Sequence, residues 1–354
     1  MTLVDLQITN LRNIDSLKWQ CHPRLNVIFG ENGSGKTALL EAIYLLGSGR
    51  SFRTREIGPL IRHEEEALVV FAKMDDAQTI SLKKTKALPT QARINGESCR
   101  NSSELASFLP AQLFYQDLFQ ILDAGPPVRR QLLDWGVFHS QPDYHPTWKN
   151  YKELLKQRNH LLKQHHCSLQ LLAPWDQQLT ELATQLDIAR KMYFLAWEPK
   201  FYELLAQVMD IPCTLQYTKG WDTENTGKSL MDILKENYLS DKYRSYTQHG
   251  AHQADLSIDS QQFSAKKHLS RGQQKMILFA LKLAQAQLLL KPCTYLCDDL
   301  TAELDKKHVE RLLTLMDSLP GQFFITALEH SSAFESIKDK ATFFSLDIRE
   351  TVNT

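Results

Sequence analysis

One glycine-rich stretch near the start of the chain constrains the fold more than any other feature. It reads Gly30-Glu31-Asn32-Gly33-Ser34-Gly35-Lys36-Thr37 and fits the pattern G-x-x-x-x-G-K-[ST]. Glycines let such a loop curl until successive backbone N–H groups point at phosphate oxygens. The apolar run Leu25–Phe29 precedes the stretch, and helical spacing follows it from Thr37 to Leu46. This context favours a P-loop between a strand and a helix over an ordinary glycine-rich turn.

The P-loop pattern gives each of its polar side chains an expected role. Lys36 should reach the β- and γ-phosphates of a nucleoside triphosphate, and the Thr37 hydroxyl should ligate Mg²⁺. The helix that follows presents its positive N-terminus to the same anion. We therefore expect ATP and Mg²⁺ as cofactors, Gly30–Thr37 as the binding loop, and Lys36 among the catalytic residues.

A second acidic motif follows the strand pattern Thr294–Cys297. Asp298 and Asp299 stand directly after it. In P-loop proteins a carboxylate at a strand end helps to hold Mg²⁺, which suits Asp298. The next carboxylate can orient or deprotonate the attacking water, which suits Asp299 as a catalytic residue. A solvated Asp-Asp turn is the alternative, but the apolar strand and the P-loop favour the functional interpretation.

The segment Leu269–Lys275 precedes a long helix predicted over Gln273–Leu290. Ser270 is a good N-cap residue, and Gly272 leaves room for a close approach. Gln273 and Lys275 can face an anion at this helix start. A simple capped helix is the alternative interpretation.

Length and patterning favour two lobes. The chain has 354 residues, of which 43% are hydrophobic and 23% are charged, as in an ordinary globular protein. Helical patterns dominate from Gly125 to about Met209, whereas strands and helices alternate elsewhere, including a helix expected over Lys306–Ser318. The predicted fold class is α/β: a P-loop NTPase head formed by residues 1–123 and 245–354, with a mainly helical lobe and its connection, 124–244, inserted between.

Charge and cysteine usage narrow the class of protein further. Lys and Arg total 41, as do Asp and Glu, so any DNA binding would need local basic patches. The six cysteines are scattered singly, which favours reduced thiols in the cytoplasm. No export signal is visible, and polar residues interrupt the apolar stretch Met276–Leu290, so no membrane partner is expected. For His165-His166-Cys167 a solvated helix end is favoured over a metal site.

Two basic clusters are candidate DNA contacts. Arg50, Arg53 and Arg55 follow the P-loop helix, and Lys152, Lys156 and Arg158 lie in a helical pattern whose leucines would face the helical lobe. Each cluster is alternatively an ordinary solvated face. Binding by such clusters would be directed at the DNA backbone and sensitive to salt.

Taken together, these motifs carry a resemblance to a known family. P-loop, LS-x-G-Q signature and paired acids occur in this order in the ATP-binding-cassette (ABC) heads of the SMC type, and within that group the chain resembles the RecF family. The resemblance extends over nearly the whole chain. It is carried by Gly30–Thr37, Leu40–Tyr44, Gly49–Arg53, Gly125–Arg130, Leu132–Gly136, Leu154–Asn159, Leu269–Lys275 and Asp298–Asp305.

The resemblance implies a mechanism and partners. Ser270, Gly272 and Gln273 would contact the γ-phosphate of nucleotide bound to a second copy, giving an ATP-dependent homodimer, and Gln116 would serve as the Q-loop residue. Asp299 stands where related heads carry a catalytic Glu. RecF-like proteins are weak DNA-dependent ATPases that act on gapped or duplex DNA, with RecO and RecR as partners, to promote RecA loading.

Some positions depart from the family pattern. Gly250-Ala251-His252-Gln253 stands where the family has Gly-Pro-His-Arg, and the switch His of many cassette ATPases is missing after Ile325–Leu328, although His330 is close. An ATPase subunit of a transporter or a small-molecule kinase would also explain the P-loop. Neither explains the long helical insertion together with Leu269–Lys275. A further alternative is a switch protein that binds ATP without hydrolysing it.

Overall fold

The computed structural model describes residues 2–260, 263–328 and 331–346. The chain forms two compact units, which are considered separately. The head unit comprises Met1–Leu118, Leu204–Met209 and Arg271–Thr354, and the inserted unit comprises Phe119–Glu203 and Asp210–Ser270. These divisions differ from the boundaries expected after residues 123 and 244. One reason is that the strand Asp255–Ser260 pairs with Thr214–Thr218 inside the inserted unit.

A parallel sheet forms the centre of the head unit, with strand order β14-β3-β13-β12-β8. Its strands are β3 (Leu25–Phe29), β8 (Ala111–Phe114), β12 (Thr294–Cys297), β13 (Gln322–Ala327) and β14 (Ala341–Ser345). Every residue of β12 and β13 is buried, as expected for a parallel sheet covered on both faces. Because the carboxyl ends of parallel strands lie at one edge, the segments after β3, β8 and β12 meet there.

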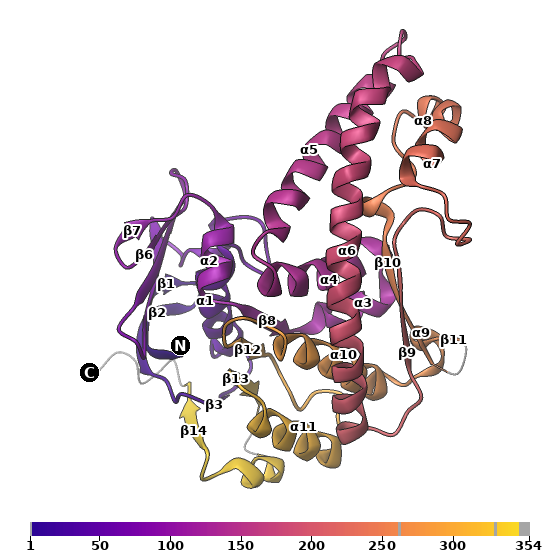
Figure 1. The fold of residues 1–354 in the computed structure, drawn as a ribbon. Helices are drawn as coiled ribbons and strands as arrows, with labels where there is room; N and C mark the ends of the chain where they lie inside the picture. The colour runs from indigo at the N-terminus through magenta and orange to yellow at the C-terminus, as the bar shows by residue number, and fades with distance from the viewer. Residues whose placement is uncertain (1, 261–262, 329–330, 347–354) are drawn as a thin grey trace. The chain divides into compact units, whose positions relative to one another are not determined.

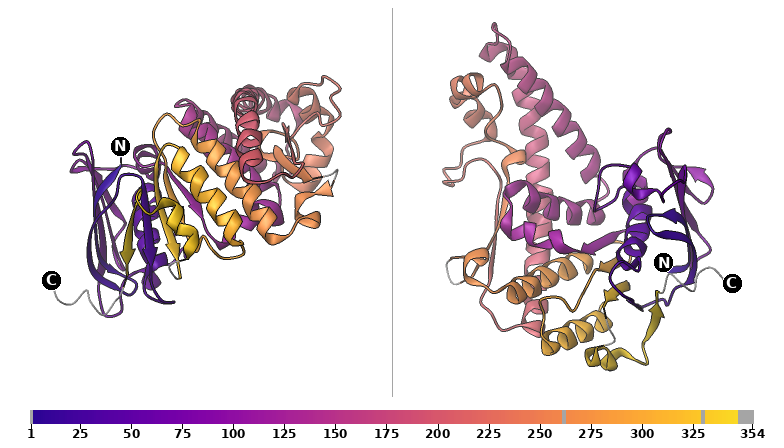
Figure 2. Two further views of the ribbon diagram at one scale, coloured as in Figure 1. Left: turned by 90° about the horizontal axis from the view of Figure 1, so that it is seen from below. Right: turned by 180° about the vertical axis from the view of Figure 1, so that it is seen from behind.

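A second, antiparallel sheet has the strand order β2-β1-β4-β5-β6-β7. Its strands are β1 (Leu3–Leu11), β2 (Ile14–Gln20), β4 (Ala67–Met74), β5 (Thr79–Thr85), β6 (Gln91–Ile94) and β7 (Glu97–Ser98). Helix α1 (Lys36–Ser48) contacts strands of both sheets, which explains why it is buried on nearly all sides. The P-loop helix is therefore held between two layers (Figure 2).

Among its described residues, the head unit contains further α-helices. They are α2 (Ser102–Phe108), α10 (Arg271–Ala286) and α11 (Lys306–Ser318). The Asp305 carboxylate caps α11 by accepting a hydrogen bond from the His308 N–H at 2.9 Å. Helix α10 starts immediately after the predicted signature residue Ser270.

The inserted unit is mainly helical and carries a small antiparallel sheet of order β11-β10-β9. Its elements are α3 (Gln120–Asp123), α4 (Pro126–Ser140), α5 (Tyr144–Leu162), α6 (Leu169–Val208), β9 (Thr214–Thr218), α7 (Leu230–Glu236), α8 (Tyr238–Arg244), β10 (Asp255–Ser260), β11 (Phe263–Ser264) and α9 (Ala265–His268). Helix α6 continues into the head unit at Leu204. Helices α5 and α6 lie side by side (Figure 1). None of the helices in the described ranges combines the length and apolarity needed to span a bilayer.

Arg158 is the clearest departure from the expectations for this unit. The sequence suggested that Arg158 is a surface contact for DNA. Its side chain is 0% exposed, so this prediction is wrong. The guanidinium donates to Asp176 at 2.6 Å, to Asp241 at 2.8 Å and to Thr247 at 2.7 Å. It therefore ties α5 to α6 and to the segment around α8. Removing one partner of such a buried ion pair costs about 3–5 kcal/mol.

Candidate nucleotide-binding site

The P-loop runs from the end of β3 to the start of α1. Gly33 and Gly35 have φ of 82° and 100°, a left-handed conformation in which a side chain would be strained. Asn13, in the turn between β1 and β2, donates from its side-chain amide to the Gly33 carbonyl at 2.7 Å. A Cβ on Gly35 would lie 3.2 Å from the Asn13 Oδ1. Asn13 thus braces the loop, a role that its sequence context did not indicate.

Lys36 lies over the loop that it follows. Its ammonium group donates to the carbonyl of Gly30 at 2.5 Å and to that of Glu31 at 2.9 Å. Burial lowers the pKa of Lys36, while Asp299 and Asp298 oppose that shift. Within the described part of the chain, the buried Ser34 Oγ has no hydrogen-bond partner. The loop therefore carries a cation and a hydroxyl that a phosphate can engage.

Residues far apart in the sequence meet beside this loop. The Thr37 hydroxyl donates to the Asp298 carboxylate, with 3.1 Å to each oxygen. Thr326 in β13 also donates to Asp298, at 2.8 Å, and its oxygen accepts from the Asp299 N–H at 2.8 Å. Burial raises the pKa of Asp298, and the two threonine hydroxyls oppose that shift. The sequence predicted Thr37 and Asp298 together, but it gave no sign of Thr326.

The arrangement fits a divalent cation held partly by the nucleotide. The Oδ1 of Asp299 is buried without a hydrogen-bond partner among the described residues. In those same residues no group of three or more His, Cys, Asp and Glu side chains forms a self-sufficient metal site. Mg²⁺ is commonly bound through one or two carboxylates together with substrate phosphates and water. Thr37 and Asp298 supply oxygen atoms of that kind.

Asp299 also has an unusual backbone. Its φ of 47° lies in the left-handed region. Asp and Asn enter this region more readily than other residues that carry a side chain. The hydrogen bond from the Asp299 N–H to Thr326 helps to hold the conformation. This preference is a physical reason for Asp at this position.

Gln116 stands at the same edge of the sheet. It begins the 3-10 turn Gln116–Phe119, shortly after β8, and its side chain is exposed. The Asp298 N–H donates to the Phe114 carbonyl at 2.9 Å, so the segments after β8 and β12 are directly joined. The segment that carries Gln116 therefore lies next to the end of β12.

The start of α10 is packed against the segment that follows Asp299. A Cβ on Gly272 would lie 2.9 Å from the Glu303 carbonyl, which explains the glycine. The Lys275 ammonium donates to the Ala302 carbonyl at 2.6 Å and to the Leu300 carbonyl at 3.3 Å. The sequence suggested that Lys275 faces an anion at the helix start, and the structure contradicts this. Lys275 is buried, and it holds the loop Asp299–Leu304 in place. Ser270 is exposed and belongs to the inserted unit.

The arginine cluster after α1 is anchored by a buried acid. Glu41 of α1 is 0% exposed; it accepts hydrogen bonds from Arg12 and from the Ser51 hydroxyl. The Ser51 oxygen in turn accepts from the backbone N–H of Arg53 at 2.9 Å. Arg50, Arg53 and Arg55 themselves are exposed. Hydrogen bonds thus hold the backbone of the cluster, while its arginine side chains are exposed.

The aromatic residue inside this cluster links it to the edge that carries Gln116. The ring of Phe52 lies 5.5 Å from Tyr44 of α1 and 4.9 Å from Tyr115, measured between centroids. Tyr115 directly precedes Gln116. Through Phe52, the loop that carries the arginine cluster therefore packs on both the P-loop helix and the segment after β8.

The segment Gly250–Gln253, which departs from the family pattern at Ala251 and Gln253, belongs to the inserted unit. His252 belongs to the inserted unit, where its Nε2 is 2.9 Å from the Thr247 carbonyl and its Nδ1 is 2.7 Å from the Tyr151 hydroxyl. Because a carbonyl only accepts, Nε2 carries the proton and Nδ1 accepts from Tyr151. Burial lowers the pKa of His252 to about 4, so the ring is neutral at pH 7. His330 lies outside the described residues.

Comparisons with known proteins show which family this chain belongs to. Residues 2–345 match the family described as RecF/RecN/SMC N terminal domain. The DNA replication and repair protein RecF of Marinomonas sp. (strain MWYL1) is 40% identical over 337 residues, covering 93% of this chain and 91% of the relative. RecF of Pseudomonas paraeruginosa (strain DSM 24068 / PA7) is 38% identical over 338 residues, with the same coverage of 93% and 91%.

Solved structures show the same fold. The recombination mediator protein RecF-ATP in the RecFOR pathway matches with a TM-score of 0.80 and 25% identity, over 94% of this chain and 93% of that one. The Smc head bound to the C-winged helix domain of ScpA matches with a TM-score of 0.61 and 16% identity, over 97% and 94%. The predicted P-loop NTPase head of the ABC type is therefore confirmed. The family model covers residues 2–345, and the RecF relative from Marinomonas is 40% identical over 93% of this chain. The chain therefore belongs to the RecF family of DNA replication and repair proteins.

Proposed function

We propose that this protein is an ATP-dependent DNA-binding protein of recombinational repair and replication restart, acting in the cytoplasm. The observation that carries the proposal is the meeting of Thr37 with Asp298 at 3.1 Å, across 261 positions of the sequence, beside a complete P-loop. Such a convergence provides both halves of a nucleotide site. Membership of the RecF family supplies the biological context.

In this proposal Gly30–Thr37 bind ATP, with Lys36 on the β- and γ-phosphates. Thr37 and Asp298 hold Mg²⁺, which neutralises phosphate charge when bound. Asp299 orients the attacking water and accepts its proton, since its Oδ1 lacks a competing partner among the described residues. The expected activity is slow hydrolysis of ATP to ADP and phosphate, stimulated by DNA. Gln116 contacts the bound nucleotide from the adjacent strand end.

We further propose that ATP drives pairing of two copies. Ser270, Gly272 and Gln273 of one copy contact the γ-phosphate held by the other, which completes each site. The support is the position of these residues at the start of α10, where a helix N-terminus attracts an anion. Two-fold symmetry makes both sites equivalent.

DNA contact is assigned to the exposed basic residues. Arg50, Arg53 and Arg55 are held by a buried anchor, and Lys152 and Lys156 are exposed on α5. Phosphate contacts of this kind give affinity that falls steeply with salt. The assignment excludes Arg158, which is buried. Because a solved RecF structure is described as part of the RecFOR pathway, we propose RecO and RecR as partners in promoting RecA loading.

The proposal is tested by measuring the mass of the purified chain in solution. ATP should convert a monomer to a dimer and ADP should not, because ADP lacks the γ-phosphate. The ATP form should bind duplex or gapped DNA more tightly than the ADP form. A mass and a DNA affinity that are the same with ATP and ADP would contradict the proposal.

The hydrolysis step gives a separate prediction for Asp299→Asn. The amide keeps the size of the side chain but cannot accept the water proton, so turnover should fall about 100-fold. Binding of Mg²⁺-ATP, measured by calorimetry, should be retained. In contrast, Asp298→Asn should weaken Mg²⁺-dependent binding itself. Unchanged turnover in Asp299→Asn would place the base elsewhere.

A further inference from the structure

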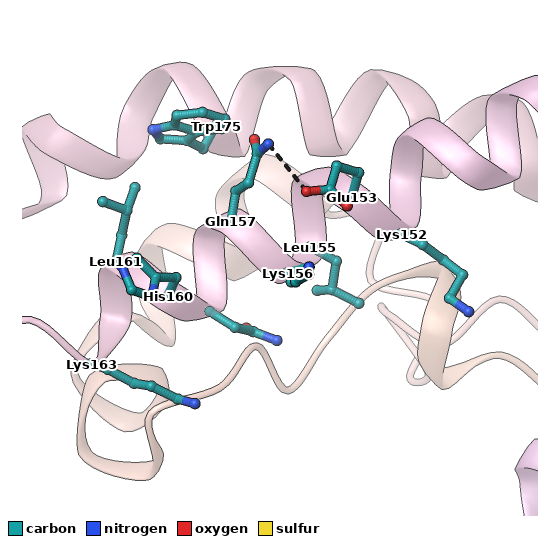
Figure 3. Close-up of a pocket in the computed structure, with 10 residues that line it drawn as sticks. Lys152, Glu153, Leu155, Lys156, Gln157, His160, Leu161, Lys163 and Trp175 are labelled. Carbon is teal, nitrogen blue, oxygen red and sulfur yellow. Dashed lines mark hydrogen bonds between the residues drawn. The ribbon is translucent and has the colours of Figure 1, made fainter.

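A groove of about 760 Å³ follows α5 in the inserted unit. Its lining includes Lys152, Lys156, Lys163, Leu155, Leu161 and Trp175. Figure 3 shows Trp175 on α6, which runs beside α5, with Lys152 and Lys163 pointing away from α6. The groove therefore combines an aromatic face with amino groups and lies wholly within one compact unit.

Two of the lysines lie on α5, and Lys163 directly follows its last residue. Lys156 and Lys163 come four and eleven residues after Lys152, so at helical geometry all three project within about 40° of one another, over about 16 Å. Each of the three side chains is exposed. The Lys152 ammonium also lies 4.3 Å from the centroid of the Trp148 ring. A row of exposed cations at helical spacing matches a chain of repeated anions.

Besides the lysines, the lining contains one carboxylate and an apolar surface. Glu153 also lines the groove, and its carboxylate accepts a hydrogen bond from the Gln157 side chain at 3.5 Å. Leu155, Leu161 and Trp175 are each partly buried, so part of each side chain is left to contact a ligand. A ligand that fits must therefore present anions along one side and flat apolar groups along the other.

We propose that this groove binds a few nucleotides of single-stranded nucleic acid, with phosphates on Lys152, Lys156 and Lys163 and a base stacked on Trp175. Unpaired bases offer a free aromatic face, and stacking on aromatic side chains is a general mode of binding single strands. In a duplex both faces of an internal base are already stacked. An acidic peptide would match the lysines but does not by itself supply flat rings at the indole.

This inference rests on the proposed DNA-binding function and gives it a specific site for an unpaired strand. It shares Lys152 and Lys156 with the proposed DNA contacts, and it adds Lys163 and the aromatic face of Trp175, which select an unpaired strand. The groove should therefore act without ATP-driven pairing of two copies.

The test measures binding of a fluorescent oligothymidylate to the full chain by anisotropy, in the presence of ADP. Trp175→Leu should weaken binding about tenfold, whereas Trp175→Phe, which keeps a ring, should retain most of it. In a triple variant with Lys152, Lys156 and Lys163 changed to Gln, the slope of log affinity against log salt should fall by about 2. Lys149→Gln, an exposed lysine of α5 outside the groove, is the matched control.

All variants should show the circular dichroism spectrum and the thermal unfolding of the parent, which checks that they fold. A parent that does not bind the oligothymidylate, or groove variants that bind it like the parent, would overturn the groove assignment. So would a polyglutamate peptide that binds in a Trp175-dependent way while the oligothymidylate does not. If the parent shows no ATP-dependent binding to any DNA, the proposed function itself fails. If the parent binds duplex DNA in an ATP-dependent way and the groove variants bind the oligothymidylate like the parent, the proposed function stands. Only the groove assignment is then wrong.

Discussion

Replacing Ser270 by Arg should leave the protein monomeric in ATP. The residue precedes α10, whose N-terminus is proposed to meet the γ-phosphate held by a second copy. A guanidinium adds bulk at a closely packed interface and places positive charge beside the positive end of the helix. We expect ATP-dependent association to weaken about 100-fold, or ~2.8 kcal/mol, together with loss of stable DNA binding. Light scattering and DNA-binding titrations with ATP and ADP measure both effects.

Two comparisons make this result specific. The variant should still bind ATP, because its own P-loop is intact. Ser16→Arg, an exposed serine on β2, should pair and bind DNA like the parent. If Ser270→Arg forms the ATP dimer as well as Ser16→Arg does, the signature assignment is wrong, and the ATP-gated pairing loses its main support.

Local patterns predicted the central elements of the head well. The strand Thr294–Cys297 and the helix Lys306–Ser318 were expected and are confirmed. Each has a clear local signal: a short apolar run before charged residues in one case, and an amphipathic spacing with an Asp cap in the other. The long signature helix was expected to run to Leu290, but α10 ends at Ala286. Helix ends depend on contacts beyond the local pattern.

The site was predictable where one motif defines it, and not where tertiary contacts do. Glycine and lysine spacing identified the P-loop, and the strand before Asp298 placed the acid near Thr37. Thr326 was missed because a threonine inside an apolar strand is typical of any sheet. Its contact with Asp298 at 2.8 Å arises from the pairing of β13 beside β12.

Charged residues gave the least reliable predictions, because charge alone does not reveal burial. Lys275 and Arg158 both occur in polar local contexts, yet both are buried and bonded to the protein itself. Lys275 holds backbone carbonyls after Asp299, and Arg158 pairs with acids 18 and 83 positions away. Only the folded chain brings such partners together, so the sequence pattern could not separate them from the solvent-facing Lys152 and Lys156.

Replacing Lys36 by Met should nearly abolish nucleotide binding. Methionine keeps the length of the side chain but removes the ammonium, which donates to the Gly30 and Glu31 carbonyls and is proposed to hold the β- and γ-phosphates. Charge-assisted hydrogen bonds contribute about 1.5–3 kcal/mol each, so losing those to phosphate should lower Mg²⁺-ATP affinity about 100-fold. Calorimetric titration measures this directly. Lys18→Met, an exposed lysine on β2, should bind ATP like the parent.

The Lys36→Met variant should also separate the two DNA activities. ATP-driven pairing and the duplex binding that depends on it should be lost, because no γ-phosphate is held for the second copy. The α5 groove lies in the other unit, so oligothymidylate binding in ADP should persist. Mg²⁺-ATP affinity equal to that of Lys18→Met would refute the P-loop assignment. Loss of oligothymidylate binding in a folded Lys36→Met protein would show instead that the groove depends on the nucleotide site.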